Sequence, residues 1–232
     1  RLYGRYYPIQ RCFDGNHKII SGLTITETTG GEDYAVGLFG VVDGGTVKNL
    51  ILADVGIDVP KSEMAGGAFG MLTGGGTADN IAVSGSVSAK RGNGGIVGRM
   101  TISGTISNCV NNAEINGTGA NVGGIVGRLN GKSAARSTVL RCANFGTISN
   151  GTNNFSAGIV GTAYYTTLSE CYNVGSATGN RVGGILGQTD SNTTVTSCYN
   201  AGAITLAAAG NHNYAGSLIG YNDGGSVSNC YY

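Results

Sequence analysis

The chain has 232 residues, of which 43 are glycine, two are proline and none is tryptophan, and 41% are hydrophobic. Each interior glycine costs a helix about 1 kcal/mol relative to alanine, so this much glycine excludes a helical enzyme domain. Collagen is excluded because the glycines do not recur at every third residue. The hydrophobic fraction argues against a disordered chain. A net charge of +1, from 14 basic and 13 acidic residues, offers no long-range attraction to a phosphate backbone, so no nucleic-acid partner is expected.

Residues 1–33 are expected to form an opening or capping coil. From Phe13 to Ile25 the segment alternates apolar and polar residues after a turn, as a half-buried strand does. We expect it to pair with the coil that contains Gly37 and Gly40. The chain opens at Arg1 without a signal peptide or an apolar run long enough to cross a bilayer, which indicates a fragment of a larger protein with no membrane span in this part.

Residues 34–232 contain seven copies of a motif in which two glycines flank apolar residues, the last repeat being truncated. The closing glycines of successive motifs recur with a period of about 30 residues, and a period of this length is typical of a solenoid. The motifs are Gly37–Gly40, Gly67–Gly70, Gly95–Gly98, Gly124–Gly127, Gly158–Gly161, Gly184–Gly187 and Gly216–Gly220.

A column of cysteines follows the later motifs at a nearly constant offset, and Leu50 and Ile81 hold the same position in the first two repeats. A position that accepts Cys, Leu and Ile is a buried apolar one, since free cysteine behaves as a small hydrophobe. Stacked cysteines would lie within disulfide range, but parallel side chains rarely reach the required torsion, so free thiols are favoured and disulfides stay open. The column cysteines are Cys109, Cys142, Cys171, Cys198 and Cys230.

An asparagine stands two residues after four of these cysteines, and a small residue follows two positions later. Asparagine tolerates the left-handed conformation of a corner, and its side-chain amide can donate to the equivalent carbonyl one coil away. We therefore predict a ladder of stacked asparagine side chains. They are Asn111, Asn144, Asn173 and Asn200.

Each repeat contains about three short strand-like pieces separated by Gly, Asn, Ser and Thr, and no segment typical of a helix. One coil of three strands cannot bury its inner face alone, so the coils must stack, with parallel pairing between repeats. Parallel crossovers are overwhelmingly right-handed. The sequence thus predicts one all-β domain over residues 1–232, a right-handed parallel β-helix of seven to eight coils with about 30 residues each.

At these motifs the chain resembles the GLUG-motif repeat family, named for a Gly-Leu-apolar-Gly core. Gly37-Leu-Phe-Gly40 matches that core most closely, and Gly-Ile-Val-Gly is the commoner variant here. Such repeats occur in large bacterial surface proteins, including adhesin-like proteins and the non-catalytic parts of IgA-cleaving metallopeptidases. The resemblance implies an extracellular stalk or binding module displayed on a bacterial cell surface, and it implies no catalytic residues.

The sequence offers little for metal or acid–base chemistry, and no cofactor is expected. Its two histidines, His17 and His212, lack the close helical spacing of a zinc peptidase. Polysaccharide lyases and hydrolases also use β-helices, and Asp190 and Asp223 of neighbouring coils fall in one column with Asp43 and Asn130. Turn formation, calcium binding and catalysis are the alternatives for this column, and turn formation is favoured.

Tyrosines are the best candidates for contact with a glycan. Tyr172, Tyr199 and Tyr231 each follow a column cysteine, so they should point outward on successive coils. Tyr164 and Tyr165, together with Tyr221, are expected in the loop after the glycine motif. Their flat apolar faces and polar hydroxyls could hold sugar rings or an extended partner chain, or the tyrosines could merely shield the coil surface.

Arg99 and Arg128 follow the closing glycines of adjacent repeats, so two like charges should lie side by side. The pair could bind an anionic sugar or sulfate, or it could be a solvated surface pair.

The first functional hypothesis is therefore a non-catalytic, adhesive stalk or spacer that presents its loops to a glycan or a host surface protein. A carbohydrate-binding module is the second hypothesis, and a polysaccharide-degrading enzyme is the third. The segment after Asn150 and the Ala207–Asn213 segment depart most from the repeat and are expected to make contacts.

Overall fold

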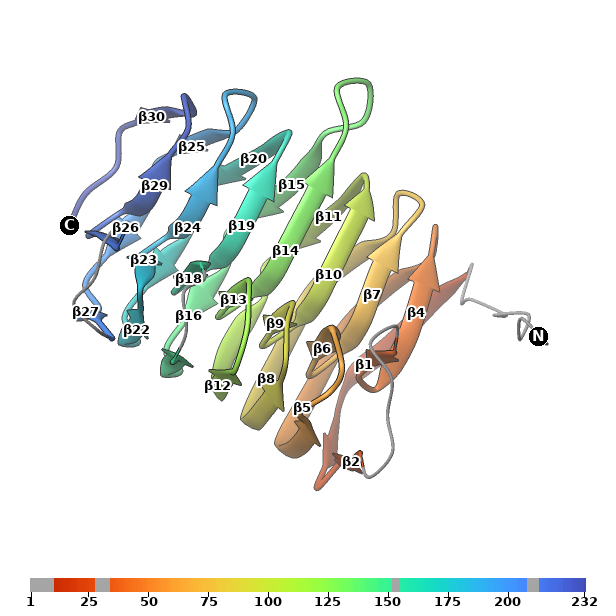
Figure 1. Cartoon of the computed structure of the whole chain (residues 1–232). Coiled ribbons are helices and arrows are strands. Elements are labelled where there is room, and N and C mark those ends of the chain that lie inside the picture. Colours follow the sequence, from red (N-terminus) through yellow and green to blue (C-terminus); the bar gives the residue numbers. More distant parts are fainter. Residues whose placement is uncertain (1–10, 28–33, 152–154, 208–212) are drawn as a thin grey trace, which may run out of the picture.

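The computed structural model of the chain describes residues 11–27, 34–151, 155–207 and 213–232, and within these ranges it contains strands and turns but no helix. Strands of successive repeats pair in parallel, so the chain winds into a solenoid whose coils stack in chain order from red to blue (Figure 1). Two of its sheets have seven strands each, one for every glycine motif. The predicted all-β parallel solenoid, with one coil for each repeat, is confirmed, while its right-handedness stays a prediction.

Three sheets run along the stack. The pre-glycine sheet and the post-glycine sheet lie on either side of the glycine motif, and the broad sheet, with 16 strands, receives the rest of each coil. Figure 1 shows the post-glycine strands side by side across the front of the molecule. The pre-glycine strands are β3 (Ala35–Val36), β6 (Met64–Gly66), β9 (Asn93–Gly94), β13 (Val122–Gly123), β18 (Phe155–Ala157), β23 (Arg181–Gly183) and β28 (Tyr214–Gly216). The post-glycine strands are β4 (Phe39–Asp43), β7 (Phe69–Thr73), β10 (Val97–Ile102), β14 (Val126–Gly131), β19 (Val160–Tyr164), β24 (Leu186–Thr189) and β29 (Ile219–Asn222).

The broad sheet departs from the prediction of three short strands per repeat. In the first two coils one strand runs through the cysteine-equivalent position and beyond, so that β5 has 14 residues and β8 has 13. In later coils the same stretch is divided into separate short strands. Its strands are β1 (Cys12–Ser21), β2 (Thr24–Thr26), β5 (Thr46–Val59), β8 (Thr77–Ala89), β11 (Gly104–Ser107), β12 (Val110–Gly117), β15 (Ser137–Leu140), β16 (Ala143–Asn144), β17 (Ile148–Asn150), β20 (Thr166–Ser169), β21 (Tyr172–Asn173), β22 (Ala177–Gly179), β25 (Thr194–Thr196), β26 (Tyr199–Asn200), β27 (Ile204–Leu206) and β30 (Ser226–Ser228).

The opening coil packs where the sequence predicts. Both β1 and β2 pair in parallel with β5, which belongs to the coil of Gly37 and Gly40. Residues 1–10 and 28–33 of the predicted cap lie outside the described residues.

A left-handed residue makes the corner before each column position. Its φ lies between 51° and 55° in all seven coils, and it directly precedes the cysteine, leucine or isoleucine. We expected the ladder asparagines to take this conformation, and that was wrong: they lie past the corner, in extended strands. The corner residues are Asn49, Asn80, Asn108, Arg141, Glu170, Ser197 and Asn229.

The cysteine column faces the interior, as predicted. Cys109, Cys142, Cys171 and Cys198 are buried, Cys230 in the last coil is partly buried, and all five are free thiols. Each Sγ donates to the carbonyl oxygen two residues earlier, over 3.1 to 3.4 Å. These short local bonds satisfy the thiols inside an otherwise apolar core.

The asparagine ladder is also confirmed. Asn111, Asn144 and Asn173 each donate from Nδ2 to Oδ1 of the next asparagine, over 2.8, 2.7 and 2.8 Å. Every Nδ2, including that of Asn200, also donates to the carbonyl two residues on. Leu52 and Val83 pair at the equivalent place in the first coils, so the ladder begins at Asn111.

Candidate functional site

The tyrosines that follow the cysteines form an exposed file on the broad sheet. Tyr172 pairs in register with Tyr199, and Tyr199 forms a parallel bridge with Tyr231. Their exposed fractions are 40%, 46% and 67%, so they point outward as predicted. We call Tyr172, Tyr199 and Tyr231 the tyrosine file.

Phe145 extends the aromatic surface by one coil, which the sequence reasoning missed. Its ring packs edge-on against Tyr172, with 5.7 Å between the ring centroids, and it is 46% exposed. Phe145 stands three residues after its cysteine, whereas the tyrosines stand one residue after theirs, so its position in the repeat does not predict that it joins them. Only the diagonal contact between adjacent coils brings it to the file.

Tyr164 and Tyr221 were expected in loops, but they lie in strands β19 and β29 of the post-glycine sheet. Parallel pairing between the post-glycine strands continues for several residues past the closing glycine of each motif, so these strands are longer than expected. The Tyr164 hydroxyl donates to Gln188 Oε1 over 3.4 Å. Tyr165 is left-handed, with φ 49°, and its backbone N–H donates to Asp190 Oδ1 over 3.2 Å.

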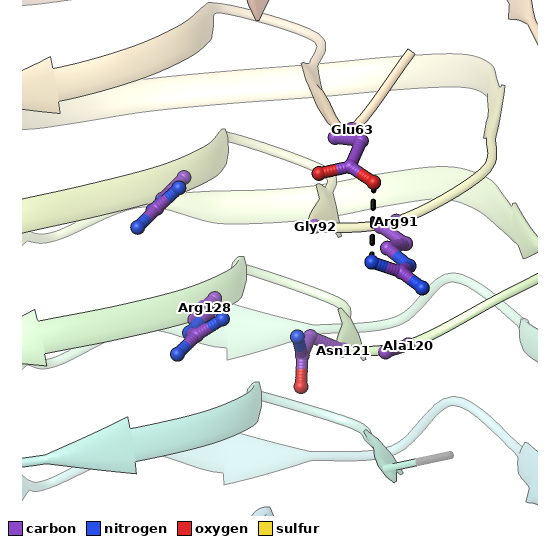
Figure 2. Close-up of a pocket in the computed structure, with 7 residues that line it drawn as sticks. Glu63, Arg91, Gly92, Ala120, Asn121 and Arg128 are labelled. Atoms are coloured by element: carbon purple, nitrogen blue, oxygen red, sulfur yellow. Dashed lines mark hydrogen bonds and ion pairs between the residues drawn. The ribbon is translucent and has the colours of Figure 1, made fainter. Parts of the chain in front are cut away.

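Arg99 and Arg128 lie side by side, as predicted, on the outer face of β10 and β14. They line a cavity of about 120 Å³ together with residues from the segments that lead into β6, β9 and β13. Figure 2 shows Glu63 joined to Arg91 on one side of this cavity, and Arg128 and Asn121 on the other. The complete lining is Glu63, Arg91, Gly92, Arg99, Ala120, Asn121 and Arg128.

The two arginines differ in their partners. Arg128 donates from Nε to Asn130 Oδ1 over 3.0 Å, and its guanidinium lies 6.0 Å from the centroid of the Tyr164 ring. The Arg99 Nε is buried and has no hydrogen-bond partner among the described residues. Burial, and next the charge of Arg128, lower the pKa of Arg99, while Glu63 acts in the opposite direction.

Of the aspartate column, Asp190 stabilises a turn, whereas Asp43 and Asn130 lie within strands β4 and β14. Asp190 Oδ1 accepts from Thr193 Oγ1 over 2.7 Å and from Tyr165 N over 3.2 Å, so the carboxylate fixes the turn after β24. Among the described residues no three His, Cys, Asp or Glu side chains gather as metal ligands would. His212 and most of the two segments predicted to make contacts, after Asn150 and at Ala207–Asn213, lie outside the described residues.

Comparisons with known proteins support the fold. A crystal structure from Bacteroides ovatus, described provisionally as that of an immunoglobulin A1 protease, superposes with a TM-score of 0.70 at 20% identity. The match covers 93% of this chain and 68% of that one. At this identity the likeness shows a shared solenoid fold alone. No family model matches the chain, and no curated protein matches it.

In the described ranges no helix has the length and apolar character to cross a membrane.

Proposed function

We propose that the chain is a non-catalytic repeat module of a bacterial secreted or cell-surface protein. It acts as a stiff stalk or spacer and binds a glycan, or a glycan-bearing host protein, through the tyrosine file. The in-register exposure of Tyr172, Tyr199 and Tyr231 is the observation that carries this proposal.

The stalk role follows from how the coils are joined. From the coil of β3 and β4 onward, successive coils are hydrogen-bonded to each other through three sheets, and the buried asparagine ladder adds side-chain bonds in the same direction. Because each coil buries its apolar face only against the coils beside it, the array keeps its contact surfaces at a fixed spacing. A bacterial surface location is supported by the likeness to GLUG-type repeats and by the solenoid from Bacteroides ovatus.

The binding role rests on the tyrosine rings. Successive strands in a sheet lie about 4.8 Å apart, so the file offers a continuous row of aromatic faces with hydroxyl groups at its rim. Sugar rings have apolar faces and polar edges, which match this surface. The backbone bonds of β21 and β26 hold the tyrosines in place before a ligand arrives, which lowers the entropy lost on binding.

A glycan array probed with the purified chain tests the proposal. We expect binding that weakens by about tenfold or more in Tyr172→Ala/Tyr199→Ala, since each ring contact contributes about 1 kcal/mol. Tyr34→Ala removes a ring of similar exposure, 56%, that lies outside the file, and should bind as the wild type does. Unchanged circular dichroism would show that the variants keep the fold. Binding that survives in the double variant, or no binding to any glycan, would refute the role of the file.

A further inference from the structure

The outer face of the post-glycine sheet contains an electrostatic arrangement that folding alone does not favour. Arg99 and Arg128 are direct neighbours on adjacent parallel strands. Like charges directly opposite each other destabilise a sheet, and a partly buried guanidinium also loses hydration. Both effects lower the pKa of Arg99. An unoccupied pair of this kind therefore costs the fold free energy.

The described residues compensate Arg99 poorly. Arg128 has the Asn130 amide and the Tyr164 ring, and Arg91 has an ion pair with Glu63 over 3.1 Å, but the part of the chain that the structure describes offers the buried Arg99 Nε no acceptor. Buried donors in folded proteins nearly always have an acceptor. The unpaired donor of Arg99 therefore points to a functional role, because a bound ligand could supply the missing acceptor.

The cavity between these side chains has the chemistry of an oxyanion site. Three of its lining residues are arginines and one is a glutamate that is already paired, so its net charge is positive. Thr162 Oγ1 donates to Asn121 Oδ1 over 2.6 Å, which leaves the Asn121 amide nitrogen as a further donor. Figure 2 shows this nitrogen on the side that faces Arg128 and Arg91, with the oxygen turned away. A volume of about 120 Å³ holds several water molecules, or one carboxylate or sulfate group with the atoms that carry it.

The surface beside the cavity is suited to a sugar. Gln188 lies in the column of Arg128, beyond the buried Thr162, and the Tyr164 ring lies next to it with its hydroxyl bonded to Gln188. Gln188 and Tyr164 offer hydrogen-bonding groups and one aromatic face side by side. The backbone of β10, β14 and β19 is paired on both sides, so no strand edge is open to an added peptide.

We propose that Arg99, Arg128 and Asn121 bind the carboxylate or sulfate group of an acidic glycan, with Tyr164 and Gln188 contacting the adjoining sugar. Each arginine can donate two parallel hydrogen bonds to such a group, and the anion removes the repulsion between the two guanidiniums. The site lies on the post-glycine sheet and is separate from the tyrosine file on the broad sheet.

Calorimetric titration tests the site with three soluble probes: an oligogalacturonate, which carries carboxylates, a sulfated chondroitin oligosaccharide, and a neutral galactose oligosaccharide. We expect the wild type to bind at least one acidic probe at the arginine site. The neutral probe should not bind at this site. The oligogalacturonate and the sulfated probe separate the two sources of the anionic group. Arg99→Gln/Arg128→Gln should weaken acidic binding by about tenfold or more.

The matched control is Lys18→Gln/Arg141→Gln, which removes two exposed positive charges, one in β1 and one at the corner before β16, and should change binding by no more than about twofold. Arg99→Gln/Arg128→Gln should unfold at the same temperature as the wild type or higher, because the repulsion is gone. Tyr172→Ala/Tyr199→Ala should keep acidic binding, which separates this site from the tyrosine file. The proposal is overturned if neither acidic probe binds, if the arginine variant binds as the wild type does, or if only an acidic peptide shows the arginine-dependent binding.

Discussion

The Asn144 side chain donates from Nδ2 to Oδ1 of Asn173 over 2.7 Å, and both side chains are fully buried. The same Nδ2 donates to the carbonyl of Gly146, while Asn144 Oδ1 accepts from Asn111. Each inner amide of the ladder therefore joins three coils, and its loss leaves polar groups unpaired in a dry interior. Unpaired buried groups cost more than the net value of the bonds that they formed.

Asn144→Ala is expected to lower the free energy of unfolding by about 2–4 kcal/mol, because Asn111 loses an acceptor and Asn173 loses a donor at once. The guanidinium-induced unfolding midpoint, followed by circular dichroism, measures the loss. Asn112→Ala changes an exposed asparagine in the same strand as Asn111 and should leave the midpoint nearly unchanged. Equal midpoints for the two variants would mean that the ladder contributes nothing to stability.

The small residues beyond the ladder are required by close approach between coils. A Cβ atom on Gly175 would overlap the carbonyl oxygen of Gly146, and a Cβ on Gly202 would overlap that of Gly175. Since the obstacle is backbone in both cases, no side chain can rotate away. Gly175→Ala should therefore lower the free energy of unfolding by about 1–3 kcal/mol, measured by the same unfolding transition.

Gly151→Ala provides the comparison for Gly175→Ala. A Cβ at Gly151 would meet no atom of the described residues within 4 Å, and the position is exposed. Replacing glycine by alanine at an unhindered position restricts the unfolded chain, so this variant should be as stable as the wild type or slightly more stable. A similar loss in both variants would contradict the packing argument.

The solenoid and its interior columns could be predicted from the sequence because they repeat. A position that recurs every coil must lie at the same place in the stack, so Cys142 and Asn144 reveal their burial through Cys171 and Asn173. The left-handed corner was missed because Arg141 and Glu170 stand where asparagine stands in other coils. Arginine and glutamate have no preference for the left-handed conformation, which the stacked backbone imposes at this corner.

The arginine cavity was predictable only in part. The register of Arg99 and Arg128 follows from the glycine motif, so their adjacency can be read from the sequence. Glu63, Arg91 and Asn121 come from turns of unequal length between the broad and pre-glycine sheets, where no repeat aligns them. Tyr164 was expected in a loop because the strand length after the motif varies between coils, from four residues in β24 to six in β10.

The thiol column predicts a loss of stability at alkaline pH. The thiol of the preceding coil, together with burial, raises the pKa of Cys142, Cys171 and Cys198 above the ordinary value. The folded state therefore keeps these protons at a pH at which the unfolded chain, with thiol pKa values near 8.5, releases them. The stabilisation is complete below the unfolded pKa and is lost as the pH rises toward the folded pKa.

Under reducing conditions, the free energy of unfolding should thus fall between pH 8 and pH 10, by about 2 kcal/mol for each such thiol, since one pH unit corresponds to about 1.4 kcal/mol. Cys171→Ala removes one of the three groups and should make the fall smaller by that amount, even if the variant is less stable at pH 8. Cys12→Ala removes a thiol that lies outside the buried column and is the matched control, which should lose as much stability as the wild type over this range. If Cys171→Ala and the wild type lose equal stability over this range, Cys171 is not held protonated by the core.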